Sequence, residues 1–194
     1  MIYWVSRFLC FFLLKILCHL KVRGEEHIPK KGGFILAANH VSFLDPLALG
    51  AVCPRKMNYM ARHDLFSRPV LGWWLFQIGA FPVKRNSADL SALKEAMRCV
   101  KKGRGLLLFP EGSRQSESLT ANPQAGIGFL AAKLGCPVIP AFVKGSEMAL
   151  PKGARFLKSA KITVHFGQQI LIERRMPYQD IAQLIMARIR HLSC

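Results

Sequence analysis

The chain has 194 residues, a length that suits one domain with a sizeable core, and no linker rich in Gly, Ser or Pro divides it. Hydrophobic residues make up 51% of the chain, yet a mean hydropathy of +0.21 is too polar for a polytopic membrane protein. Lys and Arg number 28 against 11 Asp and Glu, and the formal net charge of +17 favours polyanions or anionic surfaces as partners. Six cysteines occur without metal-ligand spacing, so we expect unpaired thiols in a reducing compartment and no bound metal.

Residues 1–20 predict an amphipathic helix that lies in a membrane interface. Arg7 and Lys15 interrupt the apolar run, and the longest stretch without a charge, residues 8–14, is far shorter than the ~20 residues of a spanning helix. Helical periodicity gathers the basic residues on one side and large apolar residues on much of the rest. The basic side comprises Arg7, Lys15, His19 and Lys21. A signal peptide fits less well, because no A-x-A-type cleavage site follows. The open alternative is a helix packed on the protein's own core.

Residues 21–194 predict a single α/β domain, because short apolar runs alternate with helical patterns. The expected strands lie within residues 34–38, 57–66, 105–114, 137–145 and 161–170. The expected helices lie at residues 45–52, 87–103, 126–135 and 177–192. This order implies a mixed, largely parallel sheet flanked by helices. Reactive groups in such sheets collect at the carboxyl ends of strands.

His40 and Asp45, in the stretch NHVSFLD, follow the first buried strand. On one continuous helix their side chains would point about 140° apart and would not meet. A bend between them is indicated, since Ser42 and Asp45 have capping-box spacing and Pro46 suits a first helical turn. Each residue alone also has an ordinary explanation, as a helix cap or as a hydrogen-bonded histidine at a strand end.

Two further polar clusters end predicted apolar runs. FPEGSRQ supplies Glu111, Gly112 and Arg114, and GAFPVKR supplies Lys84 and Arg85. A glycine lets the backbone approach a ligand closely, and a guanidinium group matches a phosphate. The alternative for FPEGSRQ is a surface turn with a fortuitous salt bridge. Together with His40, these clusters predict a site at one edge of the sheet.

NHVSFLD, GAFPVKR, FPEGSRQ and GCPVIPAFV resemble, in this order, the four motifs of the glycerolipid acyltransferases, which include 1-acylglycerol-3-phosphate acyltransferases. The similarity extends from about residue 22 to residue 143. One H-x-x-x-x-D motif is weak evidence, whereas four motifs in order are specific. The resemblance implies a glycerol-3-phosphate acyltransferase-like fold, with residues 21–194 as the acyltransferase domain.

The resemblance also implies how the first motif acts. His40 would be the base for the acceptor hydroxyl, and Asp45 would hold and polarise it. The hydroxyl would then attack an acyl thioester directly, without an acyl-enzyme. Ser42 and Ser113 are the side chains that would argue for a covalent route, and we interpret Ser42 as a cap or positioning group. No cofactor is implied beyond the co-substrate, either acyl-CoA or an acyl-carrier protein.

The other motifs imply acceptor binding. Arg85 and Arg114 would bind the glycerol phosphate, with Gly112 in the same loop. Glu111 would orient that loop or the glycerol hydroxyl. Where relatives often carry a lysine, this chain has Gln124, so the exact lysophospholipid stays open.

The expected substrate is lysophosphatidic acid, converted to phosphatidic acid in phospholipid synthesis, and another lysophospholipid acceptor is the alternative. The expected location is peripheral or monotopic, on the cytoplasmic face of the cell membrane, where the basic charge would favour an anionic surface. Residues 69–83 hold adjacent tryptophans, Trp73 and Trp74, and would line an acyl tunnel, contact the membrane or form core.

Two readings from other classes are less favoured. A nucleic-acid-binding protein would interleave basic residues with stacking aromatic residues, whereas the aromatic residues of this chain lie in apolar runs. We therefore expect no nucleic acid partner. A membrane-binding scaffold without activity would not need the complete set of His40, Asp45, Glu111 and Arg114.

Overall fold

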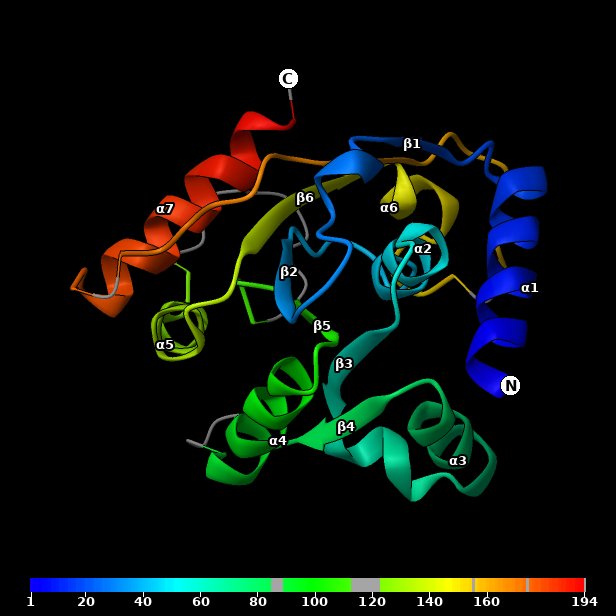
Figure 1. Ribbon diagram of the computed structural model, residues 1–194. Coiled ribbons are helices and arrows are strands. Elements are labelled where there is room, and N and C mark those ends of the chain that lie inside the picture. The colour runs from blue at the N-terminus through cyan, green and yellow to red at the C-terminus, as the bar shows by residue number, and fades with distance from the viewer. Residues whose placement is uncertain (85–88, 113–122, 155, 174, 194) are drawn as a thin grey trace.

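A sheet of seven strands runs through the centre of the part of the chain that this computed structural model describes, residues 1–84, 89–112, 123–154, 156–173 and 175–193 (Figure 1). In spatial order the strands are β1 (Lys21–Arg23), β7 (Thr163–Phe166), β6 (Val138–Lys144), β2 (Phe34–Ala38), β5 (Gly105–Leu108), β3 (Met57–Arg62) and β4 (Ala80–Val83). Every pair of neighbours is parallel except β6 and β7. The expected mixed, largely parallel sheet is confirmed.

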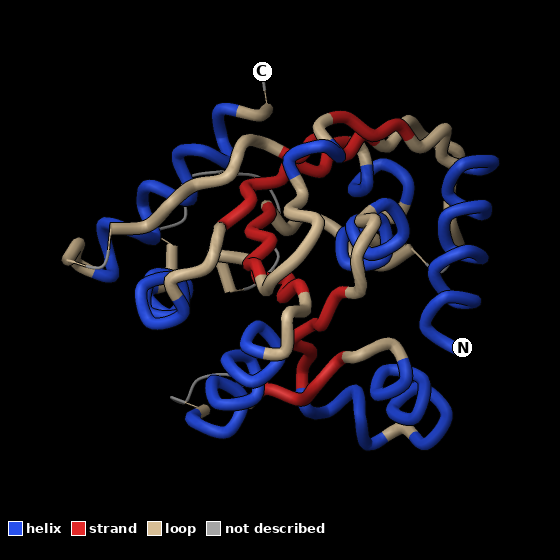
Figure 2. The backbone as a smooth tube through the Cα atoms, viewed as in Figure 1, coloured by secondary structure: helices blue, strands red, loops and turns tan. Residues whose placement is uncertain are grey.

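Helices cover both faces of this sheet (Figure 2). They are α1 (Ile2–Leu17), α2 (Asp45–Val52), α3 (Pro69–Gln77), α4 (Leu90–Lys101), α5 (Ala125–Leu134), α6 (Ser146–Ala149) and α7 (Tyr178–His191), with 3₁₀ turns at Glu25–His27 and His63–Ser67. Helices α1 and α2 lie against one face, and α4, α5 and α7 lie against the other. None of the helices in the described part of the chain is both long and apolar enough to cross a bilayer.

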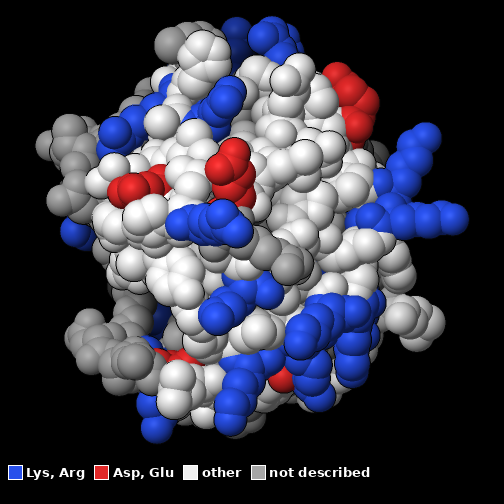
Figure 3. All heavy atoms as spheres, turned by 60° about the vertical axis from the view of Figure 1, so that its left-hand side comes forward, with Lys and Arg blue, Asp and Glu red and all other residues white. Residues whose placement is uncertain are grey.

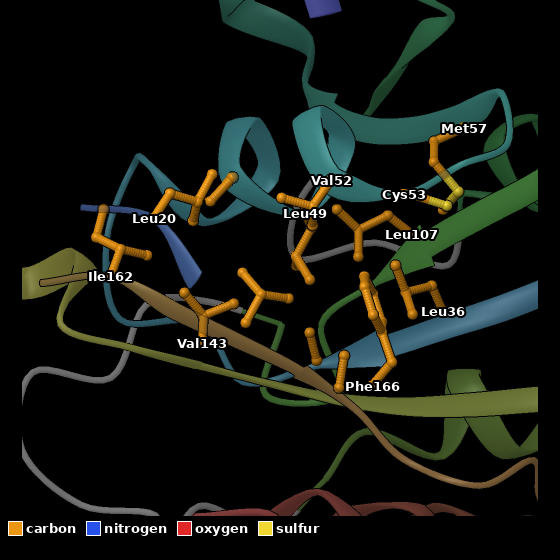
Figure 4. Packing of buried hydrophobic residues seen from close by; sticks show 14 of the residues in the cluster. Leu20, Leu36, Leu49, Val52, Cys53, Met57, Leu107, Val143, Ile162 and Phe166 are labelled. Carbon is orange, nitrogen blue, oxygen red and sulfur yellow. The ribbon is translucent and has the colours of Figure 1, made fainter. Parts of the chain in front are cut away.

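The buried strand β2 divides the core into two clusters. All five of its residues are buried, because helices cover both faces of the sheet. Alternate side chains point to opposite faces, so Phe34 and Leu36 pack with α1 and α2, whereas Ile35 packs with α4, α5 and α7. Figure 4 shows the first cluster, where Leu36, Leu49 and Phe166 from three elements meet. This packing fixes the end of β2, where His40 follows.

The N-terminal helix differs from the prediction in its basic side. It is present, but α1 ends at Leu17, so His19 and Lys21 do not lie on it. Arg7 is partly buried with its guanidinium carbon 5.5 Å from the centre of the Trp4 ring, rather than on a solvated edge. Tyr3 and Leu14 are buried in the core. The helix therefore packs on the protein along one side and leaves its other side exposed.

Residues 69–83 form α3 and β4, and their apolar side chains divide between two environments. Leu75 is buried, whereas Trp73 is 55% exposed and Phe76 is 57% exposed. Trp74 faces α1, where its Nε1 donates a hydrogen bond to Ser6 Oγ at 3.0 Å. The two adjacent tryptophans thus point to different faces of α3.

Candidate active site

The predicted polar clusters meet at one edge of the sheet. His40 follows β2, Glu111 follows β5 and Lys84 follows β4, and these three strands run in the same direction. Because their carboxyl ends share an edge, residues far apart in the sequence come together there. Asn39 fixes this edge between β2 and β6: its Nδ2 donates to Val143 O at 2.9 Å, and its Oδ1 accepts from Val143 N at 2.8 Å.

The His40 and Asp45 side chains face each other across a turn, as the spacing predicts. His40 Nδ1 lies 2.8 Å from Asp45 Oδ2. Helix α2 begins at Asp45 itself, so the two residues do not share a helix. The histidine is 13% exposed and lines a cleft, whereas the aspartate is fully buried. No described residue hydrogen-bonds His40 Nε2, which leaves that nitrogen available to a bound hydroxyl.

Asp45 is held by donors on both carboxylate oxygens. Oδ2 accepts from the backbone amides of Val41 and Ser42, each at 2.7 Å, in addition to His40. Oδ1 accepts from Ser146 Oγ at 2.5 Å. Three donors other than His40 already point at these two oxygens, so Asp45 accepts in this network. A neutral imidazole that hydrogen-bonds to it through Nδ1 therefore has its proton on Nδ1 and its lone pair on Nε2. This is the tautomer that a general base requires.

Glu111 contacts the histidine from the other strand. Its Oε2 accepts a hydrogen bond from the backbone amide of His40 at 2.9 Å, and the residue is 6% exposed. Burial raises the pKa of the Glu111 carboxyl above its usual value, and the His40 amide opposes that rise. Glu111 is not among the residues that line the cleft. The contact fits the orienting role expected for Glu111 better than contact with an acceptor.

Phe109 packs against one face of the His40 imidazole ring. The two rings stack with centroids 4.0 Å apart and planes inclined by 16°. Phe109 ends the apolar run of β5 in sequence, and this position gave no signal beyond hydrophobicity. Together, Asp45, Glu111 and Phe109 restrict His40 at its side-chain nitrogen, its backbone and its ring face.

Two adjoining cavities meet beside His40. The larger is an open cleft of about 560 Å³ lined by His40, Lys84 and Gly112, among others. The smaller, about 260 Å³, lies between α1, α2, α3 and β3 and is lined mainly by apolar side chains. The residues that line both cavities are Phe43, Pro46, Met60, Ala61, Leu65, Leu107 and Phe109. A polar group at His40 and an apolar chain in the smaller cavity would therefore be neighbours.

The remaining predicted residues lie at the rim of the cleft or outside the described part of the chain. Gly112 adopts a positive φ of 70°, a left-handed conformation that favours glycine over residues with a Cβ. Lys84 lines the cleft directly after β4. Arg85 and Arg114 lie outside the described residues.

The residues that sequence reasoning missed are Asn39, Phe109 and Ser146. Asn39 stands in the quoted motif beside His40, and a polar residue ending a buried strand was an available signal. Ser146 lies in a four-residue helix that no pattern indicated.

Comparison with known proteins gives one family. The model of the acyltransferase family matches residues 19–144. The 1-acyl-sn-glycerol-3-phosphate acyltransferase of Bacillus subtilis is 30% identical over 166 residues, which cover 83% of this chain and 80% of the relative. The enzyme of the same name from Streptococcus pneumoniae is 30% identical, with 81% of this chain and 60% of the relative covered. A chloroplastic relative from Brassica napus is 31% identical, and the matched part spans 48% of its length.

A solved structure shares the fold. The crystal structure of the 1-acyl-sn-glycerophosphate acyltransferase PlsC from Thermotoga maritima aligns with a TM-score of 0.76. The alignment covers 100% of this chain and 80% of that chain, at 22% sequence identity. At this identity the likeness concerns the fold.

Proposed function

Because the chain belongs to the acyltransferase family, we propose that it transfers an acyl chain from an acyl thioester to the free hydroxyl of lysophosphatidic acid, giving phosphatidic acid. The observation that carries the proposal is the His40–Asp45 pair beside the junction of a polar cleft and an apolar cavity. The relatives named for this reaction support the choice of acceptor.

The reaction follows from the tautomer of His40. Nε2 removes the proton from the acceptor hydroxyl while the hydroxyl oxygen forms a bond to the thioester carbonyl carbon. The tetrahedral intermediate collapses, the carbon–sulfur bond breaks, and the thiolate takes the proton from the imidazolium. Asp45, which hydrogen-bonds Nδ1 at 2.8 Å, stabilises the transient positive charge on the ring. No protein nucleophile is needed, since the acceptor hydroxyl itself attacks.

The two cavities suit the two parts of the substrates. The apolar cavity takes the acyl chain, because burying a methylene group there is favourable by about 0.8 kcal/mol. The cleft takes the glycerol phosphate, with Lys84 at its wall and Arg85 and Arg114 as the proposed phosphate ligands. Coenzyme A and an acyl-carrier protein remain the two candidate carriers of the thioester.

A peripheral position on the membrane is supported by the exposed side of α1 and α3. The large apolar residues on this exposed side are between 37% and 82% exposed: Trp4, Val5, Phe8, Leu9, Phe11, Phe12, Leu13, Ile16, Leu17, Val70, Trp73 and Phe76. Both helices also border the apolar cavity, so an acyl chain would pass from the bilayer to His40 without crossing water. Figure 3 brings forward the side of the molecule where α4, α5 and α7 lie, and on this face Lys and Arg are spread widely whereas Asp and Glu are few. This is not the side of α1 and α3, so its charge supports attraction of the whole protein to an anionic surface rather than a contact at these two helices. We propose the cytoplasmic face of the cell membrane as its location.

The test is a thiol-release assay with purified protein in mixed micelles. Acyl-CoA and an acyl-carrier-protein thioester are each offered with lysophosphatidic acid and with other lysophospholipids. We expect release with lysophosphatidic acid and its loss by about 10²- to 10⁴-fold in His40→Ala. Faster thiol release with another lysophospholipid would identify that lipid as the acceptor instead. Release that survives in His40→Ala would overturn the role of the base. No release with any pair would leave a basic membrane-binding protein without catalysis.

A further inference from the structure

Asp45 hydrogen-bonds three residues of the loop that precedes it, and Ser146 is a further partner from a distant part of the sequence. Its Oγ donates to Asp45 Oδ1 at 2.5 Å across 101 residues of sequence. Both residues are fully buried. The family match ends at residue 144, so Ser146 lies just beyond it.

The fold determines where this hydroxyl lies. Ser146 begins α6, directly after Gly145 and the end of β6. Gly145 has a φ of 88°, and a Cβ there would lie 2.0 Å from Lys161 O, so the chain turns sharply against the next segment. Ala149 of the same helix is buried in the core cluster that contains α2. Ser146 is thereby held against the first turn of α2.

The hydroxyl is not used as a helix cap. Gly145 is the N-cap of α6, and no side-chain cap bond is formed there. Among the described residues, Asp45 is the side chain to which Ser146 Oγ donates. A fully buried carboxylate oxygen without a donor is costly, and Oδ1 has this donor in the described part of the chain.

We propose that Ser146 is a positioning residue for acyl transfer, which acts by locking the carboxylate of Asp45 in the orientation that holds His40. The three donors on Oδ2 lie on one side of the carboxylate, and Ser146 completes its restraint at Oδ1. Without it, the group can rotate and carry His40 Nδ1 out of line. This inference rests on the proposed acyl transfer with His40 as base.

The kinetic test compares three variants of the full chain. Ser146→Ala removes the donor, Ser146→Thr keeps a hydroxyl, and Ala149→Gly disturbs the same helix without touching Asp45. We expect kcat to fall about tenfold in Ser146→Ala, with the KM of each substrate changed by less than about twofold. Ser146→Thr should recover most of kcat. Ala149→Gly should lower the melting temperature while kcat stays near that of the wild type.

A second readout does not depend on turnover. The Nδ1 proton of His40, shared with a carboxylate, should give a downfield proton resonance that exchanges slowly with water and is absent in His40→Ala. We expect Ser146→Ala to shift and broaden it, and Ala149→Gly to leave it in place. An unchanged resonance, a kcat within twofold of wild type in Ser146→Ala, or equal losses in Ser146→Ala and Ala149→Gly would overturn the inference. The proposed function would be wrong if the protein transferred no acyl group. A resonance that still shifted in Ser146→Ala would then support the contact between Ser146 and Asp45 alone.

Discussion

The backbone amide of His40 donates a hydrogen bond to Glu111 Oε2 at 2.9 Å, which joins two motifs that are 71 residues apart. Glu111 thereby restrains the peptide group from which the His40 side chain extends. The first and third motifs form one unit because β2 and β5 are parallel neighbours.

This contact predicts that Glu111 acts through an acceptor oxygen rather than through its charge. Glu111→Gln keeps an oxygen for the His40 amide, so we expect kcat within a few-fold of wild type. Glu111→Ala leaves that amide without its partner, and we expect a loss of about 10- to 100-fold. Steady-state thiol release measures both. If the two variants were equally impaired and the acceptor KM rose, Glu111 would contact the acceptor directly.

The raised pKa of Glu111 predicts a pH-dependent effect on stability. Because burial raises that pKa above its ordinary value of 4.5, the folded state binds the proton more tightly than the unfolded state does. The wild type therefore loses unfolding free energy as the pH rises from 4.5 through the raised pKa, and Glu111→Gln does not. We expect the melting temperature of Glu111→Gln, measured relative to that of the wild type, to increase as the pH rises from 4 to 7.

Glu95 supplies a control of opposite sign. The hydrogen bond from Arg98 lowers its pKa, so its contribution to stability is present above the ordinary 4.5 and disappears as the pH falls through the lowered pKa. The melting temperature of Glu95→Gln, measured relative to that of the wild type, should therefore decrease as the pH rises. A shift of the same sign in both variants would contradict the assignment for Glu111.

Arg85 and Arg114 are predicted to bind the phosphate of the acceptor. Replacing either by Ala should raise the KM for lysophosphatidic acid by about tenfold or more and leave the KM of the acyl donor nearly unchanged. Arg23→Ala is a control, because that exposed residue lies in β1, away from the cleft. An equal rise in both KM values would argue against a phosphate role.

Ala61 is predicted to control the passage between the cleft and the apolar cavity, since it lines both. Ala61→Phe should narrow this passage and shift the preference toward shorter acyl donors. Excluding four methylene groups costs about 3 kcal/mol, which is about 10²-fold in kcat/KM for long donors relative to short ones. Ala187→Phe places the same side chain on the exposed side of α7 and should leave the ratio unchanged. A constant ratio in Ala61→Phe would place the acyl chain elsewhere.

Membrane binding is predicted to depend on the exposed side of α1. Phe8, Leu9 and Phe12 are each at least 56% exposed, so their combined replacement by Gln spares the core. With about 1 kcal/mol lost per residue, we expect the partition coefficient on anionic vesicles to fall roughly 100-fold in sedimentation assays. The matched control replaces Phe156 and Leu171, which are 82% and 74% exposed in other segments. Similar losses in both proteins would show general adhesion rather than a docking side.

The sequence alone determined the class of the fold and the positions of the motifs. Buried strands such as Phe34–Ala38 and amphipathic helices such as Leu90–Lys101 show their hydrophobic patterns within a few neighbouring residues. The local sequence is therefore enough to predict them. The turn between His40 and Asp45 was predictable for the same reason, since Ser42, Asp45 and Pro46 are local signals. Strand β1 and helix α6 hold three and four residues, and β4 continues the apolar run that contains α3, so the sequence does not distinguish these elements.

Only the tertiary structure decided which groups meet. The contacts of Glu111 with the His40 amide, of Ser146 with Asp45 and of Phe109 with the imidazole ring each join distant segments through the order of strands in the sheet. The partial burial of Arg7 likewise depends on how α1 packs, not on its own periodicity. Strand order and helix packing are set by which apolar faces bury one another, and that choice involves the whole chain.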